Sequence, residues 1–307
     1  MLLNDNVTVI CPAKNEQDNI PLLLEKFDEL FEETKRVFEV VVIDDASTDN
    51  TYDVLLGLQK KYKFLKVLRN RVSQGKSTVI TSGIKCAEGD IIVVMDSDLQ
   101  YVPADIPSLI CDIENDTCDI VSGWRQGSYS KSIGSKIFST LNRILFGVNL
   151  HDTGAFFATK REVLDRMHAF ARKDWHRFVF PYASLEGYRI GESKVTLYPR
   201  YSGVSKYKGA SRLVFAFLDL FSFWLKTVFS NKPMIIFGLL GFMSLGIGVF
   251  FGGVYVYSKL VVKITWGFSI VNVTFFLSAG IIFILFGFIA DLLVDIKNLL
   301  ERGKYRK

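Results

Sequence analysis

The chain has 307 residues, a formal net charge of +5 at pH 7 and 49% hydrophobic residues. Its mean hydropathy of +0.24 is high for a fully soluble protein, and the length holds one domain of ordinary size plus a smaller part. Residues 1 to about 212 contain no stripe of Lys and Arg mixed with aromatic residues, which argues against nucleic acid as a partner.

Strand and helix patterns alternate along the first hundred residues. Short apolar runs predict strands at residues 7–11, 38–43, 64–68 and 91–95. Apolar residues at helical spacing predict helices at residues 19–31, 51–62 and 77–87. This alternation, with near-continuous apolar strands, predicts an α/β fold whose mostly parallel sheet is covered by helices on both faces.

Polar clusters follow three of these predicted strands at the point where each strand ends. They occupy residues 12–16, 44–47 and 96–100. Ligands of such sheets bind beyond the carboxyl ends of the strands, so we expect the three clusters to converge on one crevice. Ser47 and Asp49 are equally well placed to cap the next helix. The first strand is followed by neither a G-x-G-x-x-G motif nor a P-loop, which disfavours dinucleotide binding and P-loop chemistry.

The D-x-D segment, Asp96 to Asp98, places two carboxylates where both can face this crevice. Carboxylate oxygens suit Mg²⁺ or Mn²⁺ held jointly by the protein and a diphosphate, and Gln100 can add a neutral oxygen. A cation there would offset the negative charge of a departing nucleoside diphosphate, which is the main electrostatic demand of glycosyl transfer. A D-x-D segment alone is a weak signal, but together with the apolar strand before it and the two earlier polar clusters it predicts a metal-dependent transferase.

Taken together, the motifs resemble those of family-two glycosyltransferases with the GT-A (Rossmann-like) fold. The resemblance is narrower to the dolichyl-phosphate mannose synthase and bactoprenol (undecaprenyl-phosphate) glucosyltransferase branch. It covers nearly the whole soluble part, and the residues that carry it are Pro12 to Glu16, Val42 to Thr51, Gly89 to Gln100, Asp152 to Phe156, His176 to Phe178 and Arg200 to Tyr207.

The resemblance implies a role for each of several side chains. The residues expected to bind the donor are Pro12, Ala13, Glu16, Ile43, Asp45, Asp96, Ser97, Asp98, Gln100, Arg200 and Lys206. Those expected to bind the metal are Asp98 and Gln100, and those expected to bind the acceptor phosphate are Arg125, Lys131 and Lys136. The expected catalytic residues are Asp98, Arg125 and Asp152. Asp152 is the candidate general base, with orientation of the acceptor or capping of a turn as its alternative roles.

The sequence departs from the family pattern in four places. Lys14 stands where an aromatic residue is usual, and residues 74–76 replace the more common R-N-x-G-K run while keeping its Gly-Lys pair. Residues 101–103 replace an acidic or His residue followed by two prolines, and Ala155 separates Gly154 from Phe156. None of these departures removes a charge that the predicted mechanism needs.

Two long apolar segments follow Lys232. No acid, Lys, Arg or His occurs between Lys232 and Lys259 or between Lys263 and Asp291. Each segment exceeds the roughly 20 residues that cross a bilayer as a helix. We predict two transmembrane spans, at about 233–258 and 265–290.

The flanking charges predict the orientation of these spans. Lys and Arg gather before the first span and after the second, which places the catalytic domain and both termini in the cytosol. The start of the chain lacks the pattern of a cleaved signal peptide. The expected parts are a cytosolic GT-A domain at 1–208, an amphipathic interfacial helix at 209–231, a transmembrane hairpin at 232–295 and a basic cytosolic tail at 296–307. A helix inside the domain is the alternative for 209–231.

The predicted reaction is an inverting transfer of a hexose from a nucleotide-diphosphate sugar, UDP-glucose-like or GDP-mannose-like, to a polyprenyl phosphate, undecaprenyl or dolichyl. A phosphate monoester is already anionic at neutral pH, so it needs less help from a base than a hydroxyl does. The expected partners are the donor, the lipid phosphate and the membrane, with a second copy of the chain, a flippase or a downstream glycosyltransferase as further candidates. The alternatives are a polysaccharide synthase, disfavoured because no Q-x-x-R-W motif is present, and a non-catalytic nucleotide-binding scaffold.

Overall fold

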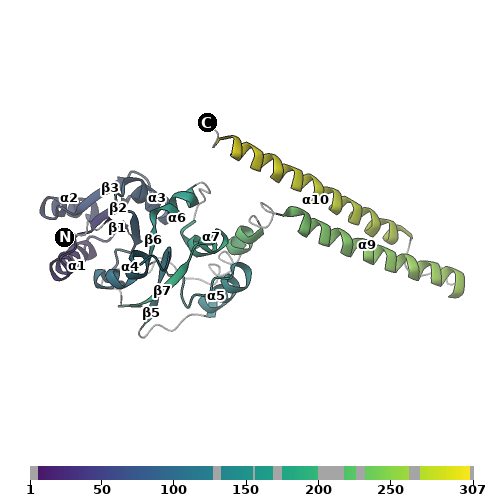
Figure 1. Cartoon of the computed structure of the whole chain (residues 1–307), viewed down its shortest axis with the longest axis horizontal. Coiled ribbons are helices and arrows are strands. Elements are labelled where there is room, and N and C mark those ends of the chain that lie inside the picture. The colour runs from purple at the N-terminus through teal and green to yellow at the C-terminus, as the bar shows by residue number, and fades with distance from the viewer. Residues whose placement is uncertain are drawn as a thin grey trace. The chain divides into compact units, whose positions relative to one another are not determined.

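The computed structural model describes residues 6–126, 133–154, 156–168, 175–199, 218–225, 232–262 and 270–304. The chain separates into two compact units, Met1–Phe217 and Leu218–Lys307. The first unit carries a sheet with its helices, and the second carries two long helices (Figure 1). The finer boundaries expected at residues 208, 231 and 295 stay a prediction.

The sheet of the first unit has seven strands. They are β1 (Val7–Ala13), β2 (Glu39–Asp45), β3 (Leu65–Asn70), β4 (Ile91–Val94), β5 (Ile120–Gln126), β6 (Phe157–Lys160) and β7 (Ile190–Thr196). Their spatial order is β3-β2-β1-β4-β6-β5-β7. Strand β6 is antiparallel to β4 and β5, and all other neighbours are parallel. The expected mostly parallel α/β sheet is confirmed.

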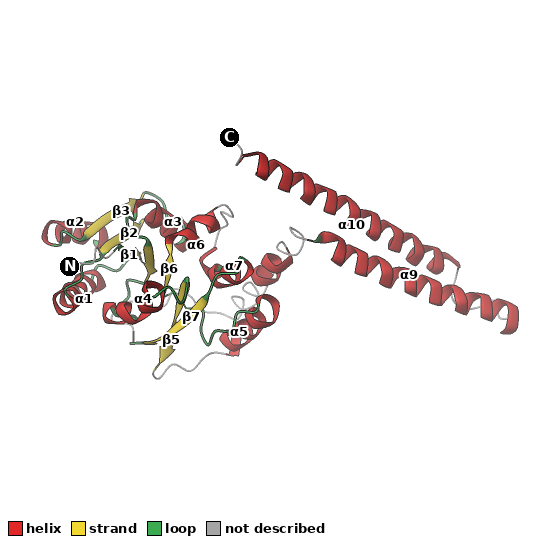
Figure 2. Cartoon of the chain, in the orientation of Figure 1, coloured by secondary structure: helices red, strands yellow, loops and turns green. Residues whose placement is uncertain are grey.

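Helices connect the strands along the chain (Figure 2). They are α1 (Asn19–Thr34), α2 (Thr51–Lys61), α3 (Lys76–Cys86), α4 (Ile106–Glu114), α5 (Ile133–Phe146), α6 (Arg161–His168) and α7 (Val179–Leu185). Two short 3₁₀ turns, η1 (Pro103–Asp105) and η2 (Trp175–Arg177), precede α4 and α7. The helices expected at 19–31, 51–62 and 77–87 are confirmed as α1, α2 and α3.

The two faces of the sheet are covered by different helices, because successive side chains of a strand point to opposite faces. Val9 and Cys11 of β1 lie in one buried cluster with apolar residues of α1 and α4. Ile10 points to the other face and meets α3. A Cβ atom at Gly83 would lie 2.7 Å from Cγ2 of Ile10 and 3.0 Å from Cδ1 of Ile43, so glycine lets α3 pack close to β1 and β2.

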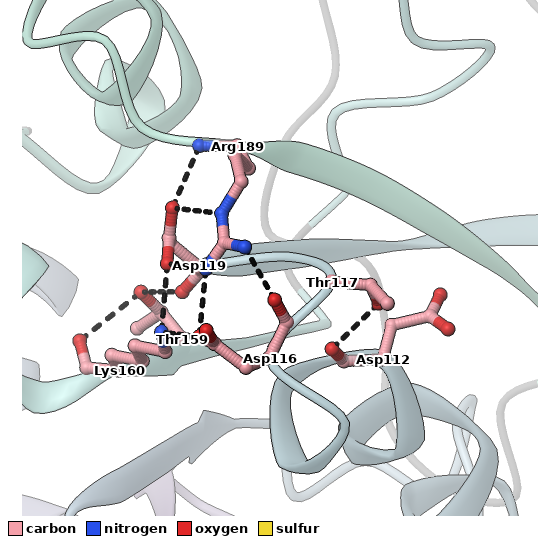
Figure 3. A network of polar contacts seen from close by, with 7 residues as sticks. All are labelled: Asp112, Asp116, Thr117, Asp119, Thr159, Lys160 and Arg189. Atoms are coloured by element: carbon pink, nitrogen blue, oxygen red, sulfur yellow. Dashed lines mark hydrogen bonds and ion pairs between the residues drawn. The ribbon is translucent and has the colours of Figure 1, made fainter.

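A network of charged side chains lies where β5 and β7 begin and β6 ends (Figure 3). Nζ of Lys160 lies 2.6 Å from Oδ1 of Asp116 and 2.8 Å from Oδ1 of Asp119. Nη2 of Arg189 lies 2.7 Å and 2.8 Å from the same two oxygens. We call these four residues the basal network. It ties the starts of the two parallel strands to the end of the antiparallel strand between them.

The second unit contains α9 (Pro233–Tyr257), a π-helical turn (Ser258–Val262) and α10 (Ile270–Lys304). Two helical stretches, Pro233–Val261 and Ile270–Ile296, are long and apolar enough to span a membrane, as the sequence predicted. Helix α10 runs beyond the span expected at 265–290 and includes most of the expected tail. Residues 218–225, inside the expected interfacial segment, are also helical.

Small residues bring α9 and α10 together. A Cβ atom at Gly241 would lie 2.9 Å from the carbonyl oxygen of Gly280, and the reverse distance is the same. One turn along, the hydroxyl of Ser244 donates a hydrogen bond to the carbonyl of Phe276 at 2.8 Å. Close backbone approach and a hydrogen bond between helices are what hold helix pairs together in a bilayer, where no hydrophobic effect acts between them.

Candidate functional site

The loops after β1, β2 and β4 are joined to one another by hydrogen bonds. Oγ of Ser97 donates to the carbonyl of Pro12 at 2.8 Å, which links the D-x-D segment to the end of β1. The amide of Asn15 donates to Oγ of Ser47 at 2.9 Å, and the amide of Glu16 donates to Oγ1 of Thr51 at 2.8 Å. The predicted convergence of the three polar clusters is therefore present. Ser47 uses its hydroxyl to join two loops.

Each of these loops contains a non-glycine residue in the left-handed region of backbone conformation. The φ angles are 56° at Asn15, 56° at Ala46 and 60° at Leu99. Asparagine tolerates this conformation, whereas alanine and leucine adopt it at a cost. Strained backbone of this kind is concentrated at functional sites, where the surrounding structure holds it in place. Among the described residues, two further non-glycine residues have a positive φ, Lys35 after α1 and Asp116 after α4, so three of the five lie at the polar clusters.

The D-x-D segment is largely enclosed. Ser97 and Asp98 are buried, and Oδ1 of Asp98 accepts a hydrogen bond from the amide of Gln100 at 3.2 Å. This turn depends on the left-handed residue Leu99, which lies between them. The amide of Tyr198 donates to the carbonyl of Gln100 at 2.9 Å, so the chain that follows β7 returns to the D-x-D segment.

Arg125 and Asp152 form a two-pronged ion pair near the end of β5. Nε and Nη2 of Arg125 donate to the two carboxylate oxygens of Asp152, the second at 2.7 Å. The Asp152 side chain is only 4% exposed, whereas that of Arg125 is 19% exposed. Oγ of Ser122 donates to the backbone carbonyl of Asp152 at 2.7 Å and fixes this loop against β5. The arrangement holds the guanidinium group in one orientation.

Tyr101 lies where the D-x-D segment and this ion pair meet. Burial raises the pKa of its hydroxyl, Arg125 lowers it, and Asp152, Asp96 and Asp98 raise it further. The Tyr101 ring packs against Phe156 with 5.0 Å between ring centroids. Four charged groups, from the D-x-D segment, from β5 and from the loop before β6, therefore act electrostatically on one buried phenol. The sequence marked Tyr101 only as a departure from the family pattern, and its central position is a finding of the structure.

Asp45 holds the loop that leads into α3. Its carboxylate accepts hydrogen bonds from side chains at Asn70 (2.9 Å) and Ser73 (2.7 Å), and from the amides of Gln74 (2.9 Å) and Gly75 (3.2 Å). Burial raises the pKa of Asp45, but these hydrogen bonds outweigh burial and lower the pKa below its usual value. Asp45 is therefore ionised at neutral pH.

The start of α3 is joined to the D-x-D segment and to η2. Lys76 forms an ion pair with Asp96. Oγ of Ser77 lies 2.7 Å from Nδ1 of His176. Burial and the positive charges of Lys76 and Arg177 lower the pKa of His176 to about 3, so the imidazole stays neutral near pH 7. Sequence alone gave no reason to connect residue 176 with residue 77.

The remaining predicted residues divide into two groups. Pro12, Ala13 and Glu16 lie at or just after the end of β1. Ile43 is fully buried and is paired with Pro12 of β1 and Leu68 of β3, so the structure does not expose it to a ligand. The other group lies outside the described residues, in full or at the level of the side chain: Lys131, Lys136, Arg200 and Lys206.

The donor set at this edge fits a cation that is shared with a substrate. Among the described residues no group of three or more His, Cys, Asp and Glu side chains is arranged to hold a metal ion. Asp98 and Gln100 nonetheless supply a carboxylate and an amide oxygen beside the second carboxylate, Asp96. Mg²⁺ in nucleotide enzymes is commonly bound by one or two carboxylates plus substrate phosphates, so this oxygen set is sufficient for that mode.

The fold and this edge of the sheet define a nucleotide-sugar transferase of a known family. Residues 8–167 match the family described as Glycosyl transferase family 2. The match covers more than half of the chain, and the chain belongs to this family.

Two curated relatives extend the likeness beyond the matched segment. The dodecaprenyl-phosphate galacturonate synthase of Rhizobium johnstonii is 31% identical over 79% of this chain and 72% of its own length. The undecaprenyl-phosphate 4-deoxy-4-formamido-L-arabinose transferase of Pseudomonas fluorescens is 28% identical over 85% of this chain and 75% of its own length. Both names join a sugar to a polyprenyl phosphate.

Solved structures share the fold at low identity. Glucosyl-3-phosphoglycerate synthase from Mycobacterium tuberculosis, in complex with Mn²⁺ and UDP, has a TM-score of 0.51 and 17% identity over 71% of this chain and 80% of its own. Mannosyl-3-phosphoglycerate synthase from Rubrobacter xylanophilus has a TM-score of 0.55 and 13% identity over 72% of this chain and 74% of its own. These likenesses establish the GT-A fold.

Proposed function

We propose that this glycosyltransferase transfers a hexose from a nucleotide-diphosphate sugar to a polyprenyl phosphate, with inversion at the anomeric carbon. The observation that carries the proposal is the meeting of the D-x-D segment and the Arg125–Asp152 pair around Tyr101. An acidic segment suited to a cation and a fixed guanidinium suited to a phosphate are thereby brought to one place.

The donor is assigned to the loops after β1, β2 and β4. Pro12, Ala13 and Glu16 border the base and ribose in this assignment, with Ile43 buried in the sheet behind them, and Asp45 fixes the loop beside them. Asp96, Ser97, Asp98 and Gln100 face the ribose and diphosphate. Asp98 and Gln100 would hold Mg²⁺ or Mn²⁺, which offsets the negative charge of the departing diphosphate when bound.

Arg200 and Lys206 are assigned to the donor phosphates. The support for Arg200 is the hydrogen bond from the amide of Tyr198 to the carbonyl of Gln100, because Tyr198 precedes Arg200 by two residues. A chain of two residues reaches only about 7 Å. This short separation along the chain is the reason for assigning Arg200 to the diphosphate. Lys206 is assigned from the family resemblance alone.

The acceptor phosphate is assigned to Arg125, with Lys131 and Lys136 on the chain that follows. A guanidinium binds phosphate oxygens in pairs, as it binds a carboxylate. Asp152 occupies the Nε–Nη2 edge of Arg125, so a phosphate would meet the Nη1–Nη2 edge, whose direction the ion pair fixes. This supports a positioning role for Asp152. A phosphate acceptor is already anionic, so transfer to it does not depend on Asp152 as a base.

The two apolar helices of the second unit supply the membrane anchor in this proposal. Lys259 and Lys263 lie between the spans, whereas Lys297, Arg302, Lys304, Arg306 and Lys307 follow the second span. This distribution supports a catalytic unit and termini on the cytosolic side. The lipid chain of the acceptor would stay in the bilayer while its phosphate meets the catalytic unit.

The test is transfer of labelled sugar into an organic-solvent extract. The purified full chain is incubated with Mg²⁺ or Mn²⁺, polyprenyl phosphate, and a panel of UDP- and GDP-hexoses. We expect label in the lipid extract with one donor of the panel and none when polyprenol replaces polyprenyl phosphate. Transfer to polyprenol, or to a soluble glycan in preference to the lipid phosphate, would refute the assigned acceptor.

A further inference from the structure

Lys76 lies beside the proposed metal site and has no part in the mechanism above. It is the first residue of α3, and its ammonium group pairs with the carboxylate of Asp96. The Lys76 side chain is 25% exposed and the Asp96 side chain 31% exposed, so the pair is partly open to solvent. Both partners are therefore accessible to a ligand that enters this edge of the sheet.

The backbone that carries Lys76 is held from two sides. On one side, the amides of Gln74 and Gly75 donate to Asp45 at 2.9 Å and 3.2 Å. On the other, the indole of Trp175 donates to the carbonyl of Ser77 at 3.2 Å and to Oγ1 of Thr81 at 3.0 Å. Any change in the position of the ammonium group must then come from the four-carbon side chain, which is flexible.

The charge of Lys76 has opposite effects on the two components that the proposed site receives. An ammonium group paired with Asp96 repels a divalent cation that approaches Asp98, two residues away. A nucleoside diphosphate brings negative charges that can attract the ammonium group away from Asp96. The Lys76–Asp96 pair thus weakens binding of the cation alone and permits binding of the cation together with the nucleotide.

From this geometry we infer that Lys76 is the resident counter-ion of the D-x-D carboxylates and couples binding of the divalent cation to binding of the nucleoside diphosphate. The inference rests on the proposed donor site. In the donor-free chain the ammonium group supplies positive charge to Asp96. When donor and cation arrive together, Lys76 moves to the diphosphate and Asp96 becomes available to the donor.

The test measures Mn²⁺ binding by electron paramagnetic resonance, with the full chain in detergent and no nucleotide present. Lys76→Gln should bind Mn²⁺ about tenfold more tightly than the native chain, because a like charge beside the site is removed. Lys76→Met carries the same expectation and serves if the first variant is unstable. Lys76→Arg, which keeps the charge, should bind as the native chain does.

Lys85→Gln is the matched control, because Lys85 is an exposed lysine in the last turn of the same helix. It makes the same change in net charge and should leave the Mn²⁺ affinity unchanged. With saturating UDP or GDP, the difference between Lys76→Gln and the native chain should fall below about threefold, because the diphosphate then partners the lysine.

Two results would count against different claims. Equal Mn²⁺ affinity without nucleotide in the native chain and in both neutral Lys76 variants would overturn the counter-ion role of Lys76. The proposed donor site would still be supported in that case if Asp98→Asn lost nucleotide-dependent Mn²⁺ binding. If Asp98→Asn binds Mn²⁺ and nucleotide as the native chain does, the proposed donor site itself is wrong.

Discussion

Charged side chains gather at both ends of the strands, and the two groups differ in what surrounds them. In the basal network, Asp116 and Asp119 each meet Lys160 and Arg189, and Asp119 also accepts the backbone amide of Arg189 at 2.9 Å. Hydrogen bonds from Arg189 hold the pKa of Asp119 well below its usual range. These contacts join neighbouring strand ends.

Left-handed backbone occurs in both groups, because Asp116 of the basal network has a φ of 54°. Aspartate tolerates this conformation, whereas Ala46 and Leu99 of the D-x-D edge adopt it at a cost. The D-x-D edge also holds a buried tyrosine on which four charged groups act. It also lies at the carboxyl ends of β1, β2 and β4, where ligands of parallel sheets bind. The comparison shows that neither density of charge nor a left-handed residue by itself identifies a site, whereas the polarity of the strands does.

The largest expected effect tests the D-x-D edge directly. Asp98→Asn keeps the shape of the side chain and removes its charge, so transfer should fall by about 1,000-fold or more as the cation loses its ligand. Removal of divalent cations with EDTA should abolish transfer in the native chain. The measurement is label in the lipid extract. Asp53→Asn, at an exposed position of α2, is the control and should keep full activity. Turnover without divalent metal would contradict the metal role.

A second prediction concerns the geometry of the Arg125–Asp152 pair. Arg125→Lys keeps the charge but loses the fork, so transfer should drop by about 100-fold, mainly through KM for the lipid phosphate. Asp152→Asn should have a similar effect, and the double variant should lose less than the two losses combined. Arg143→Lys, exposed on α5, is the matched control. Additive losses would argue that the two residues act separately.

Substitutions in the basal network should lower the stability of the fold and leave the rate of sugar transfer unchanged. Asp119→Asn removes charged hydrogen bonds to Arg189 and Lys160, which should cost about 2 kcal/mol of unfolding free energy. Transfer per folded molecule should stay at the native rate. Asp112→Asn is the control, because Thr117 bonds to the backbone carbonyl of Asp112 and not to its carboxylate (Figure 3). A specific loss of transfer in Asp119→Asn would break the contrast between the two edges.

The effect of Asp119→Asn on the free energy of unfolding should depend on pH. The folded chain lowers the pKa of Asp119, so the charged form contributes stability that is fully present above its unfolded pKa of about 4 and is lost as the pH falls below it. The difference in unfolding free energy between native chain and Asp119→Asn should be constant near pH 7 and shrink below about pH 4. Urea unfolding at several pH values measures it.

The smallest effect tests the strain at the D-x-D edge. Ala46→Gly should raise the unfolding free energy by up to about 1 kcal/mol, because glycine adopts the φ of 56° without steric cost. Ala104→Gly, at an exposed position of the 3₁₀ turn η1, is the control and should lower stability instead. Equal losses in both variants would show that Ala46 is not strained.

Patterns local in sequence predicted the first half of the sheet and its polar loops. Near-continuous apolar strands followed at once by acids identify β1, β2 and β4, because parallel strands buried on both faces need such runs. Strand β6, antiparallel and four residues long, has no such signature. Its place between β4 and β5 is set by pairing between residues 35 or more positions apart in the sequence.

The contacts that complete the site are long-range and were not predicted. Arg125 and Asp152 were singled out separately, but their pairing across 27 residues depends on how the loop before β6 folds against Ser122. The ion pair of Lys76 with Asp96 and the packing of Trp175 on α3 likewise arise from tertiary structure. The composition of the chain and the spacing of its residues do not predict such contacts.

The close packing of Gly83 has a mechanical consequence for the donor loops. Helix α3 is a rod of 11 residues, so Gly83 and Lys76 lie about two turns apart on one rigid body. A methyl group at position 83 would press on Ile10 and Ile43 and tilt or lift the rod. The start of α3 would then carry Lys76 away from Asp96. The lack of a side chain at Gly83 therefore helps to set the distance between Lys76 and Asp96 at the other end of the helix.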